Sequence, residues 1–370
     1  MDDYTDYAVN DYNYSDSDND TSLEFAVDCI IPQLHGSNIF LPTVYYLIFF
    51  MGFLGNLFVV LVVCSKSRRS RRLVDTFIVN LALADLVFVL TLPLWATSAS
   101  QHGKWEFGPA GNLLCKLSSY VIAVNRFSNI FFLTCMSVDR YLAVVKLMDS
   151  RYLRSSLCIQ ACCAAVWLCS LVMGIPVLLY RRVEEFDDKL FCMEEDNSPF
   201  FLGLSLTMVL LTFVFPVLII VLCYGTIIGH LNKHCVATVN PRADARRRHS
   251  LKMVLSIIVA FVVSWLPFNI FKVIIIGSQL LNARLTCETQ SWQINGLLIS
   301  GCLAFLNSCV NPAIYFFLDH QFRRRAETLC KTFMGNPKLL QSYNSSASFT
   351  NNGTSESFAA TGGRTQFQLE

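Results

Sequence analysis

The chain has 370 residues, of which 54% are hydrophobic, 13% aromatic and only 15% charged, and its formal net charge is +2. A soluble protein of this size cannot bury so much apolar surface, whereas membrane lipid can cover it. The composition therefore excludes a soluble protein and predicts an all-α membrane protein, for which we expect no nucleic-acid partner.

Residues 1–38 are predicted to form an acidic extracellular tail. No Lys or Arg precedes Lys66, whereas nine acids do. The tail holds glycosylation sequons at Asn13 and Asn19. Its acidic context also suits sulfation of four tyrosines, namely Tyr4, Tyr7, Tyr12 and Tyr14. We expect the tail to attract a basic peptide or protein, and simple solvation of a disordered segment is the alternative.

Seven apolar stretches follow, and each holds the roughly 20 residues that a helix needs to cross a membrane. They cover approximately residues 39–64, 76–100, 112–138, 157–180, 199–229, 252–277 and 292–318. The sequence therefore predicts a seven-transmembrane helix bundle over residues 39–318.

Basic residues gather in the segments on one side of these stretches. They are Lys66, Arg68, Arg69, Arg71 and Arg72 in the first loop, Arg151 and Arg154 after the third stretch, Arg246, Arg247, Arg248 and Lys252 at the sixth, and Arg323, Arg324, Arg325 and Lys331 after the seventh. Because basic loops stay in the cytosol, we expect an extracellular amino terminus and a cytosolic carboxyl terminus. An odd number of spans agrees with this topology, and the plasma membrane is the expected location.

Four of the 15 cysteines fall outside the membrane or at its outer edge, namely Cys29, Cys115, Cys192 and Cys287. The oxidising exterior favours disulfides, and four cysteines allow three pairings. We favour Cys115 with Cys192 and Cys29 with Cys287 over the other pairings and over free thiols.

The second stretch carries Asp85, a carboxylate at mid-membrane depth. A charged group at that depth is costly and therefore indicates a function. Together with Asn129, Asn307, Ser308 and Asn311 it can enclose a sodium ion and waters. The alternative is a protonated aspartate in a hydrogen-bonded packing knot. No other cofactor is expected.

The third stretch carries Arg126, which lies eleven residues, about three helical turns, below Cys115. A guanidinium at that depth needs an anionic partner or water. We expect it to bind the terminal carboxylate or an acidic side chain of a ligand, with Lys272 nearer the mouth as a second cation. An internal pair of Arg126 with Asp85 or with an acid of the tail is the alternative.

The inner end of the third stretch carries Asp139-Arg140-Tyr141, a charge pair at the boundary between lipid and water. Charges at that boundary are costly to keep and indicate a function. Prolines interrupt later stretches, with Pro267 in the sixth and Pro312 in the seventh. A proline frees a helical carbonyl and permits bending, so we expect these two helices to move.

After the seventh stretch, residues 319–334 place Phe322, Leu329 and Phe333 at helical spacing among arginines. This pattern predicts a short amphipathic cytosolic helix on the inner leaflet of the membrane, where Cys330 is a candidate for palmitoylation. Residues 335–370 are rich in Ser and Thr and lack apolar periodicity. They are predicted to form a disordered cytosolic tail whose phosphorylation by receptor kinases would let arrestin bind.

Several motifs of the chain occur as a set, namely Asp139-Arg140-Tyr141, Trp265-Leu266-Pro267, Asn311-Pro312-Ala313-Ile314-Tyr315 and the Cys115/Cys192 pair. The set resembles the rhodopsin class of G-protein-coupled receptors over about residues 39–330. A second set consists of Thr91-Leu92-Pro93, Trp95, Trp105-Glu106-Phe107-Gly108 and the Cys29/Cys287 pair. It is similar to the chemokine, angiotensin and related peptide receptors within that class.

This resemblance implies a ligand-driven conformational switch that acts on heterotrimeric G proteins, with the inhibitory class as the family expectation. Arg140 would be held by Asp139 at rest and would contact the G protein when active. Tyr224 and Tyr315 would then swing in to support Arg140.

The resemblance also implies a cell-surface receptor for an extracellular peptide or chemokine-like protein. Trp265 and Phe268 would couple the floor of the ligand cavity to the helix kink at Pro267. The expected ligand contacts are Trp95, Arg126, Phe268 and Lys272.

Two positions depart from the family pattern. The base of the sixth stretch reads Arg246-Arg247-Arg248-His249-Ser250 and lacks the acid that many rhodopsin-class receptors use to hold the arginine. The positive charges of this segment repel Arg140 and favour separation of the two helices, which predicts raised basal activity. Asp139 is then the one acid expected beside Arg140. Gly301 stands where chemokine receptors often carry a glutamate.

Other classes of protein fit the sequence less well. A transporter would show internal repeats or a chain of carboxylates in the membrane, but Asp85 is isolated. The outer acids form no paired constellation of the kind that an enzyme uses. A non-signalling scavenger receptor shares the fold, and the intact Asp139-Arg140-Tyr141 argues against it.

Overall fold

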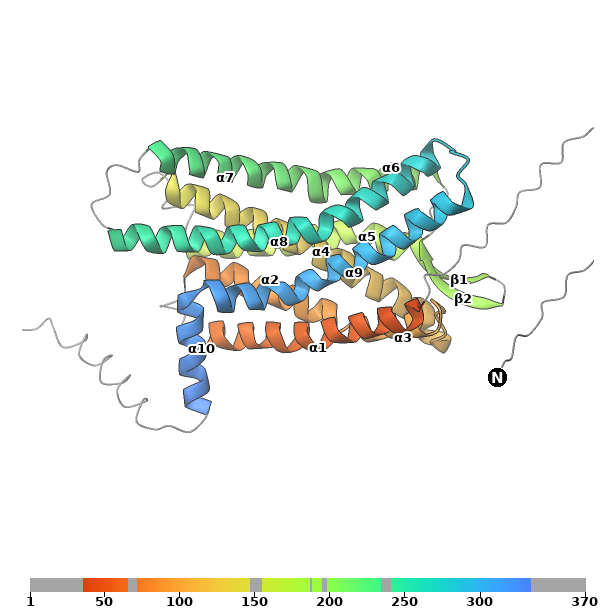
Figure 1. Ribbon diagram of the computed structural model, residues 1–370, viewed down its shortest axis with the longest axis horizontal. Coiled ribbons are helices and arrows are strands. Elements are labelled where there is room, and N and C mark those ends of the chain that lie inside the picture. Colours follow the sequence, from red (N-terminus) through yellow and green to blue (C-terminus); the bar gives the residue numbers. More distant parts are fainter. Residues whose placement is uncertain are drawn as a thin grey trace, which may run out of the picture.

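The computed structural model describes residues 36–65, 72–146, 155–186, 188–194, 198–233 and 241–333. Within these residues, seven helical segments are long and apolar enough to cross a membrane. Figure 1 shows them running side by side along the long axis of the molecule. The predicted fold, a bundle of seven membrane-spanning helices, is confirmed.

Five of the spans are continuous helices. They are α1 (Ser37–Cys64), α4 (Gly111–Val144), α5 (Ser156–Tyr180), α8 (Pro241–Leu280) and α9 (Cys287–Leu318). A short 3-10 turn, η2 (Gly108–Ala110), leads into α4.

Span two is divided into α2 (Leu73–Val89) and α3 (Leu92–Ser100). Pro93 stands in the first turn of α3, where its missing N–H costs no helical hydrogen bond. The hydroxyl of Thr91 donates to the carbonyl of Phe88 over 2.7 Å and so satisfies one acceptor at the junction. The Thr91-Leu92-Pro93 motif therefore lies where the helix of this span is interrupted.

Span five consists of α6 (Pro199–Val209), the π-helical turn η3 (Leu210–Val214) and α7 (Phe215–Lys233). Pro216 is the second residue of α7, just after the π-helical turn. A proline cannot donate to the carbonyl four residues earlier, and a widened π turn is one way in which a helix accommodates such a break.

The two ends of the bundle differ. At one end, β1 (Arg181–Phe186) and β2 (Lys189–Glu194) form an antiparallel hairpin in which Arg181 pairs with Glu194. At the other end, α10 (His320–Phe333) runs across the bundle (Figure 1). We call these the hairpin end and the α10 end. The hairpin had no counterpart among the predicted elements, which treated this segment as a loop.

Apolar side chains face both inward and outward. Val62, Phe132 and Phe261 belong to the larger of two buried clusters and are at most 1% exposed. Leu157 and Phe317 lie on outer faces and are 78% and 71% exposed. An exposed apolar belt of this kind is suited to lipid.

Several predictions concern residues outside this description. They include the acidic tail with Asn13, Asn19 and Cys29, the first basic loop before Arg72, and the Ser- and Thr-rich segment from residue 335. These predictions stay untested.

Candidate functional site

A disulfide fastens the hairpin to the bundle. Cys192 on β2 is bonded to Cys115 on α4, which confirms the first predicted pairing. The backbone N–H of Trp105, in the loop between α3 and η2, also donates to the carbonyl of Leu190 over 2.7 Å and so ties this loop to β2. Cys287 is likewise disulfide-bonded, and Cys29, its predicted partner, lies outside the described residues.

Three cations gather about one carboxylate on the bundle side of the hairpin. We call this group the cationic cluster, and its members are Arg126 on α4, Arg181 on β1, Lys272 on α8 and Glu194 on β2. Lys272 Nζ lies 2.8 Å from Glu194 Oε2, and Arg181 Nη1 lies 4.0 Å from the same oxygen. Three cations and one carboxylate give the cluster a formal charge of +2.

The charges of the cluster change the acidity of its members. Burial by itself would raise the pKa of Glu194, but the attraction of Lys272, Arg181 and Arg126 holds the pKa of this carboxyl below its usual range. Burial lowers the pKa of Arg181, and the charge of Glu194 only partly offsets this effect. Glu194 is therefore ionised at neutral pH and is the counter-ion of the cluster.

The guanidinium of Arg126 lies among aromatic rings. Its carbon is 4.8 Å from the ring centroid of Phe127, 5.8 Å from that of Trp265 and 6.0 Å from that of Phe268. Its Nε has no hydrogen-bond partner among the described residues. Within the same residues no ion pair joins Arg126 to Asp85, so the alternative of an internal Arg126–Asp85 pair is not formed. The charge of Glu194 nevertheless attracts Arg126.

Two other expected ligand contacts border the cluster. Lys272 was expected as a second cation for the ligand, but its ammonium is already engaged by Glu194. Trp95 on α3 packs against Trp105 with ring centroids 5.0 Å apart, and the guanidinium carbon of Arg181 lies 5.8 Å from the Trp95 ring.

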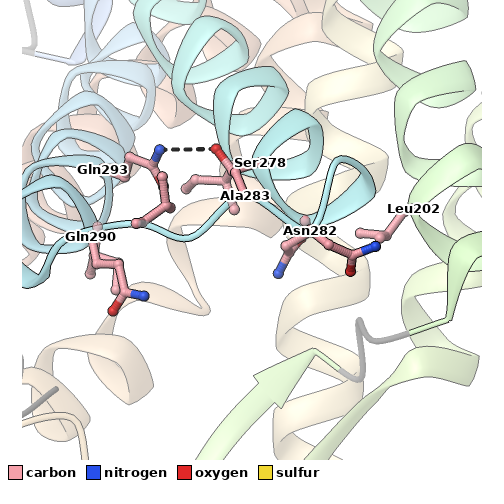
Figure 2. A pocket seen from close by; sticks show the side chains of 10 residues that line it. Leu202, Ser278, Asn282, Ala283, Gln290 and Gln293 are labelled. Atoms are coloured by element: carbon pink, nitrogen blue, oxygen red, sulfur yellow. Dashed lines mark hydrogen bonds between the residues drawn. The ribbon is translucent and has the colours of Figure 1, made fainter. Parts of the chain in front are cut away.

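A cavity of about 510 Å³ opens at the hairpin end between α6, α8 and α9. Figure 2 shows the carboxamides of Asn282, Gln290 and Gln293 around it, with Ser278 and the apolar Leu202. Gln293 Nε2 donates to Ser278 Oγ over 3.2 Å. Neutral carboxamides both donate and accept hydrogen bonds, so this wall suits uncharged polar groups such as peptide amides.

An aromatic column on α8 leads from the cationic cluster into the bundle. The rings of Phe268 and Trp265 lie 5.8 Å apart, and those of Trp265 and Phe261 lie 5.9 Å apart. The column passes Pro267, where the helix lacks a backbone donor. A displacement of Phe268 would therefore act on α8 next to Pro267, where the helix bends most easily.

Asp85 is fully buried at the centre of a polar network. Its Oδ1 accepts hydrogen bonds from Asn125 (2.9 Å), Asn129 (3.0 Å) and Ser308 (2.9 Å), and its Oδ2 accepts one from Asn311 (3.2 Å). Asn125 was not among the residues predicted for this network, although it lies one helical turn before Asn129 on the same face.

Asn307, which was expected in this network, is buried but is not joined to Asp85 by a hydrogen bond among the described residues. Its Oδ1 has no donor there, and neither does the Oδ1 of Asn129 or Asn311. Three buried carboxamide oxygens thus lack a donor among the described residues, whereas the carboxylate of Asp85 accepts four hydrogen bonds.

At the α10 end, Arg140 contacts both its own helix and α8. Its Nη2 lies 2.8 Å from Asp139 Oδ2, and its Nη1 donates to Ser250 Oγ on α8 over 2.9 Å. Asp139, the one acid expected beside Arg140, therefore lies there, and the base of α8 adds a contact through a neutral hydroxyl that was not predicted. The hydroxyls of Tyr224 and Tyr315 are buried and have no hydrogen-bond partner among the described residues.

An ionic network anchors α10. Arg72 lies 2.8 Å from Asp75 and 2.5 Å from Asp319, and Arg325 lies 2.8 Å from Asp75. Burial would raise the pKa of Asp319, but its hydrogen bond and ion pair with Arg72 hold that pKa below its usual range. The network was not predicted. Cys330, the candidate for palmitoylation, is exposed on α10.

Residues 55–315 match the family model of the 7 transmembrane receptor (rhodopsin family). The chain is 38% identical over 317 residues to "Probable G-protein coupled receptor 25" of Mus musculus, which covers 85% of this chain and 84% of that protein. It is 38% identical over 292 residues to "G-protein coupled receptor 15" of Mus musculus, with 79% of both chains covered. It is also 36% identical over 345 residues to "Apelin receptor B" of Xenopus laevis, with 91% and 92% covered.

Proposed function

Because the chain belongs to the rhodopsin family of seven-transmembrane receptors, which are signalling proteins and not enzymes, we propose that it is a cell-surface receptor for an extracellular peptide or chemokine-like protein. The ligand binds at the hairpin end, and the α10 end activates a heterotrimeric G protein. One observation carries this proposal. The single helix α8 supplies Lys272 to the cationic cluster, Trp265 to the aromatic column and Ser250 to the contact with Arg140.

Charge and redox chemistry support the orientation that we propose. Disulfides form at Cys115 and Cys287 near the hairpin end, as expected of the oxidising exterior of a cell. Arg72 and the arginines of α10 lie at the opposite end, as expected of a cytosolic face. In this orientation the receptor spans the plasma membrane with its amino terminus outside.

The ligand is a basic peptide or protein with an anionic end. Glu185 and Asp188 are exposed at the tip of the hairpin and would attract a basic ligand. Deeper in the bundle the cationic cluster would receive a carboxylate, and the rings around Arg126 suit an apolar side chain beside it. Relatives of the chain include receptors named for apelin.

Ligand binding shifts the population of conformations by its differential affinity for them. A group that contacts Lys272 and Phe268 displaces the outer part of α8, and the bend at Pro267 lets the inner part separate Ser250 from Arg140. Arg140 then becomes available to a G protein of the inhibitory class. Receptor kinases and arrestin end the signal at the carboxyl-terminal tail.

A sodium ion at Asp85 stabilises the resting state. The residues fit such an ion, since the Oδ1 atoms of Asn129, Asn307 and Asn311 have no donor within the part of the chain that the structure describes, and Asp85 is a fully buried carboxylate. Hard cations prefer oxygen ligands of this kind. The ion would supply the charge that otherwise makes a carboxylate expensive in this position.

The test is a G-protein dissociation assay in cells that express the receptor, against secreted basic peptides and chemokine-like proteins. An agonist should act on the wild type and not on Arg140→Ala. Arg126→Gln should abolish the response with surface expression intact. A potency unchanged by Arg126→Gln would refute the anion site, and agonist signalling through Arg140→Ala would refute the coupling site.

A further inference from the structure

The carboxylate of Glu194 bridges two parts of the bundle that are far apart in sequence. It starts on β2, reaches α8 and lies 2.8 Å from Lys272 Nζ. Both side chains are only 24% exposed, so this ion pair is partly shielded from water. A shielded pair is screened less by salt than a pair on an open surface.

Glu194 is held in place on two sides. Cys192, two residues earlier on β2, is fixed to α4 by the disulfide with Cys115. Arg181, directly opposite Glu194 in the hairpin, approaches the same carboxylate oxygen to 4.0 Å. The acid is therefore positioned by the fold and does not reach the cluster by chance.

One carboxylate does not neutralise the cluster. Lys272 is engaged by Glu194, whereas the Nε atoms of Arg126 and Arg181 have no hydrogen-bond partner among the described residues. The charge of Glu194 attracts Arg126, but no ion pair joins the two among the described residues. The cluster thus keeps a formal excess of positive charge that a further anion would balance, but Lys272 is already engaged.

We propose that Glu194 is a resident counter-ion that occupies, at rest, the lysine which an anionic ligand group needs, so that binding exchanges one carboxylate for another at Lys272. This inference rests on the proposed function, because it assumes that the cluster receives the ligand's anion. It adds that Glu194 of the hairpin competes with the anionic group of the ligand for Lys272. A ligand carboxylate that reaches Lys272 must displace Glu194 and then lie close to a like charge.

Glu194→Gln is the informative substitution. It keeps the shape of the side chain but removes its charge, so Lys272 becomes available and the repulsion disappears. An anionic probe should then bind about tenfold more tightly, the effect of one charge-assisted hydrogen bond. Lys272→Gln breaks the same ion pair from the other side and should weaken the probe. A general loosening of the hairpin would change probe affinity in the same direction in both variants. Exchange at Lys272 predicts that the affinity rises in Glu194→Gln and falls in Lys272→Gln.

The matched control is Glu184→Gln. Glu184 is an acid of the same hairpin, and its side chain is 40% exposed. It pairs with Arg182 at 2.7 Å, and among the described residues no ion pair joins it to the cationic cluster. This substitution changes the net charge of the hairpin by the same amount. It should leave binding of the probe unchanged.

The experiment measures thermal stabilisation of the purified full-length receptor by N-acetylphenylalanine, a free carboxylate, against N-acetylphenylalaninamide. Half-maximal stabilisation of Glu194→Gln by the carboxylate should need about one tenth of the wild-type concentration, and the amide should act equally on both proteins. Equal carboxylate concentrations for wild type and Glu194→Gln, or a higher one for the variant, would overturn the role of Glu194 and leave the proposed function standing. A carboxylate that stabilises neither protein would overturn the anion site itself, and with it this inference.

Discussion

The contact between Arg140 and Ser250 makes a direct prediction about the resting receptor. Ser250→Ala removes the hydroxyl that accepts a hydrogen bond from Arg140 Nη1 at 2.9 Å. The ion pair of Arg140 with Asp139, at 2.8 Å, remains. The variant therefore removes this hydrogen bond to α8 and leaves the ion pair within α4 intact.

The size of the effect follows from the kind of bond. A hydrogen bond to a charged group contributes about 1.5–3 kcal/mol, and Ser250 is half-buried, which favours the lower end of this range. Loss of the bond should then shift the resting equilibrium toward the active state about tenfold. Ser250→Asp places a carboxylate beside the guanidinium and should shift the equilibrium in the opposite direction.

The assay is basal nucleotide exchange on a purified G protein, normalised to the amount of receptor. Ser250→Ala should exceed the wild type and Ser250→Asp should fall below it. Ser256→Ala is the control, because the Ser256 hydroxyl donates to Lys252 O on its own helix over 2.9 Å. If Ser250→Ala matches Ser256→Ala, or if Ser250→Asp signals more than the wild type, the contact does not hold the resting state.

Further predictions concern other parts of the bundle. Asp85→Asn should abolish the stabilisation that sodium chloride gives over choline chloride in a melting experiment, and a retained sodium effect would place the ion elsewhere. Gly296→Ala should destabilise the receptor by about 1–3 kcal/mol, because an added Cβ would lie 2.2 Å from Cε1 of Phe271. Gly277→Ala, where a Cβ would meet nothing within 4 Å, should leave the melting temperature nearly unchanged. Cys330→Ser should remove incorporation of labelled palmitate, and undiminished labelling would exclude this cysteine.

The spans were predictable because each is an apolar stretch long enough to cross a membrane, a property that depends on local sequence alone. Asp85 and Arg126 were recognisable for the same reason, since a charge inside such a stretch is conspicuous. Neither observation needed knowledge of how the helices pack.

The contacts of these residues depend on helix rotation and on strand register, which a single sequence does not determine. Asn125 contacts Asp85 because of how α4 faces α2. Ser250 reaches Arg140 because α8 approaches α4 at that height, although the basic run before it suggested separation. Glu194 is one of several acids between the fourth and fifth spans, and only the hairpin and its disulfide single it out.

The central claim is that an anion bound at the hairpin end makes Arg140 available to a G protein. The most direct measurement compares G-protein activation by one peptide agonist, as its free carboxylate and as its carboxyl-terminal amide, on the wild type and Arg126→Gln at equal surface expression. The account predicts that the carboxylate is the more potent form on the wild type and that Arg126→Gln removes this preference together with the response. Equal potency of the two forms on the wild type, or an unchanged response of Arg126→Gln, would contradict it.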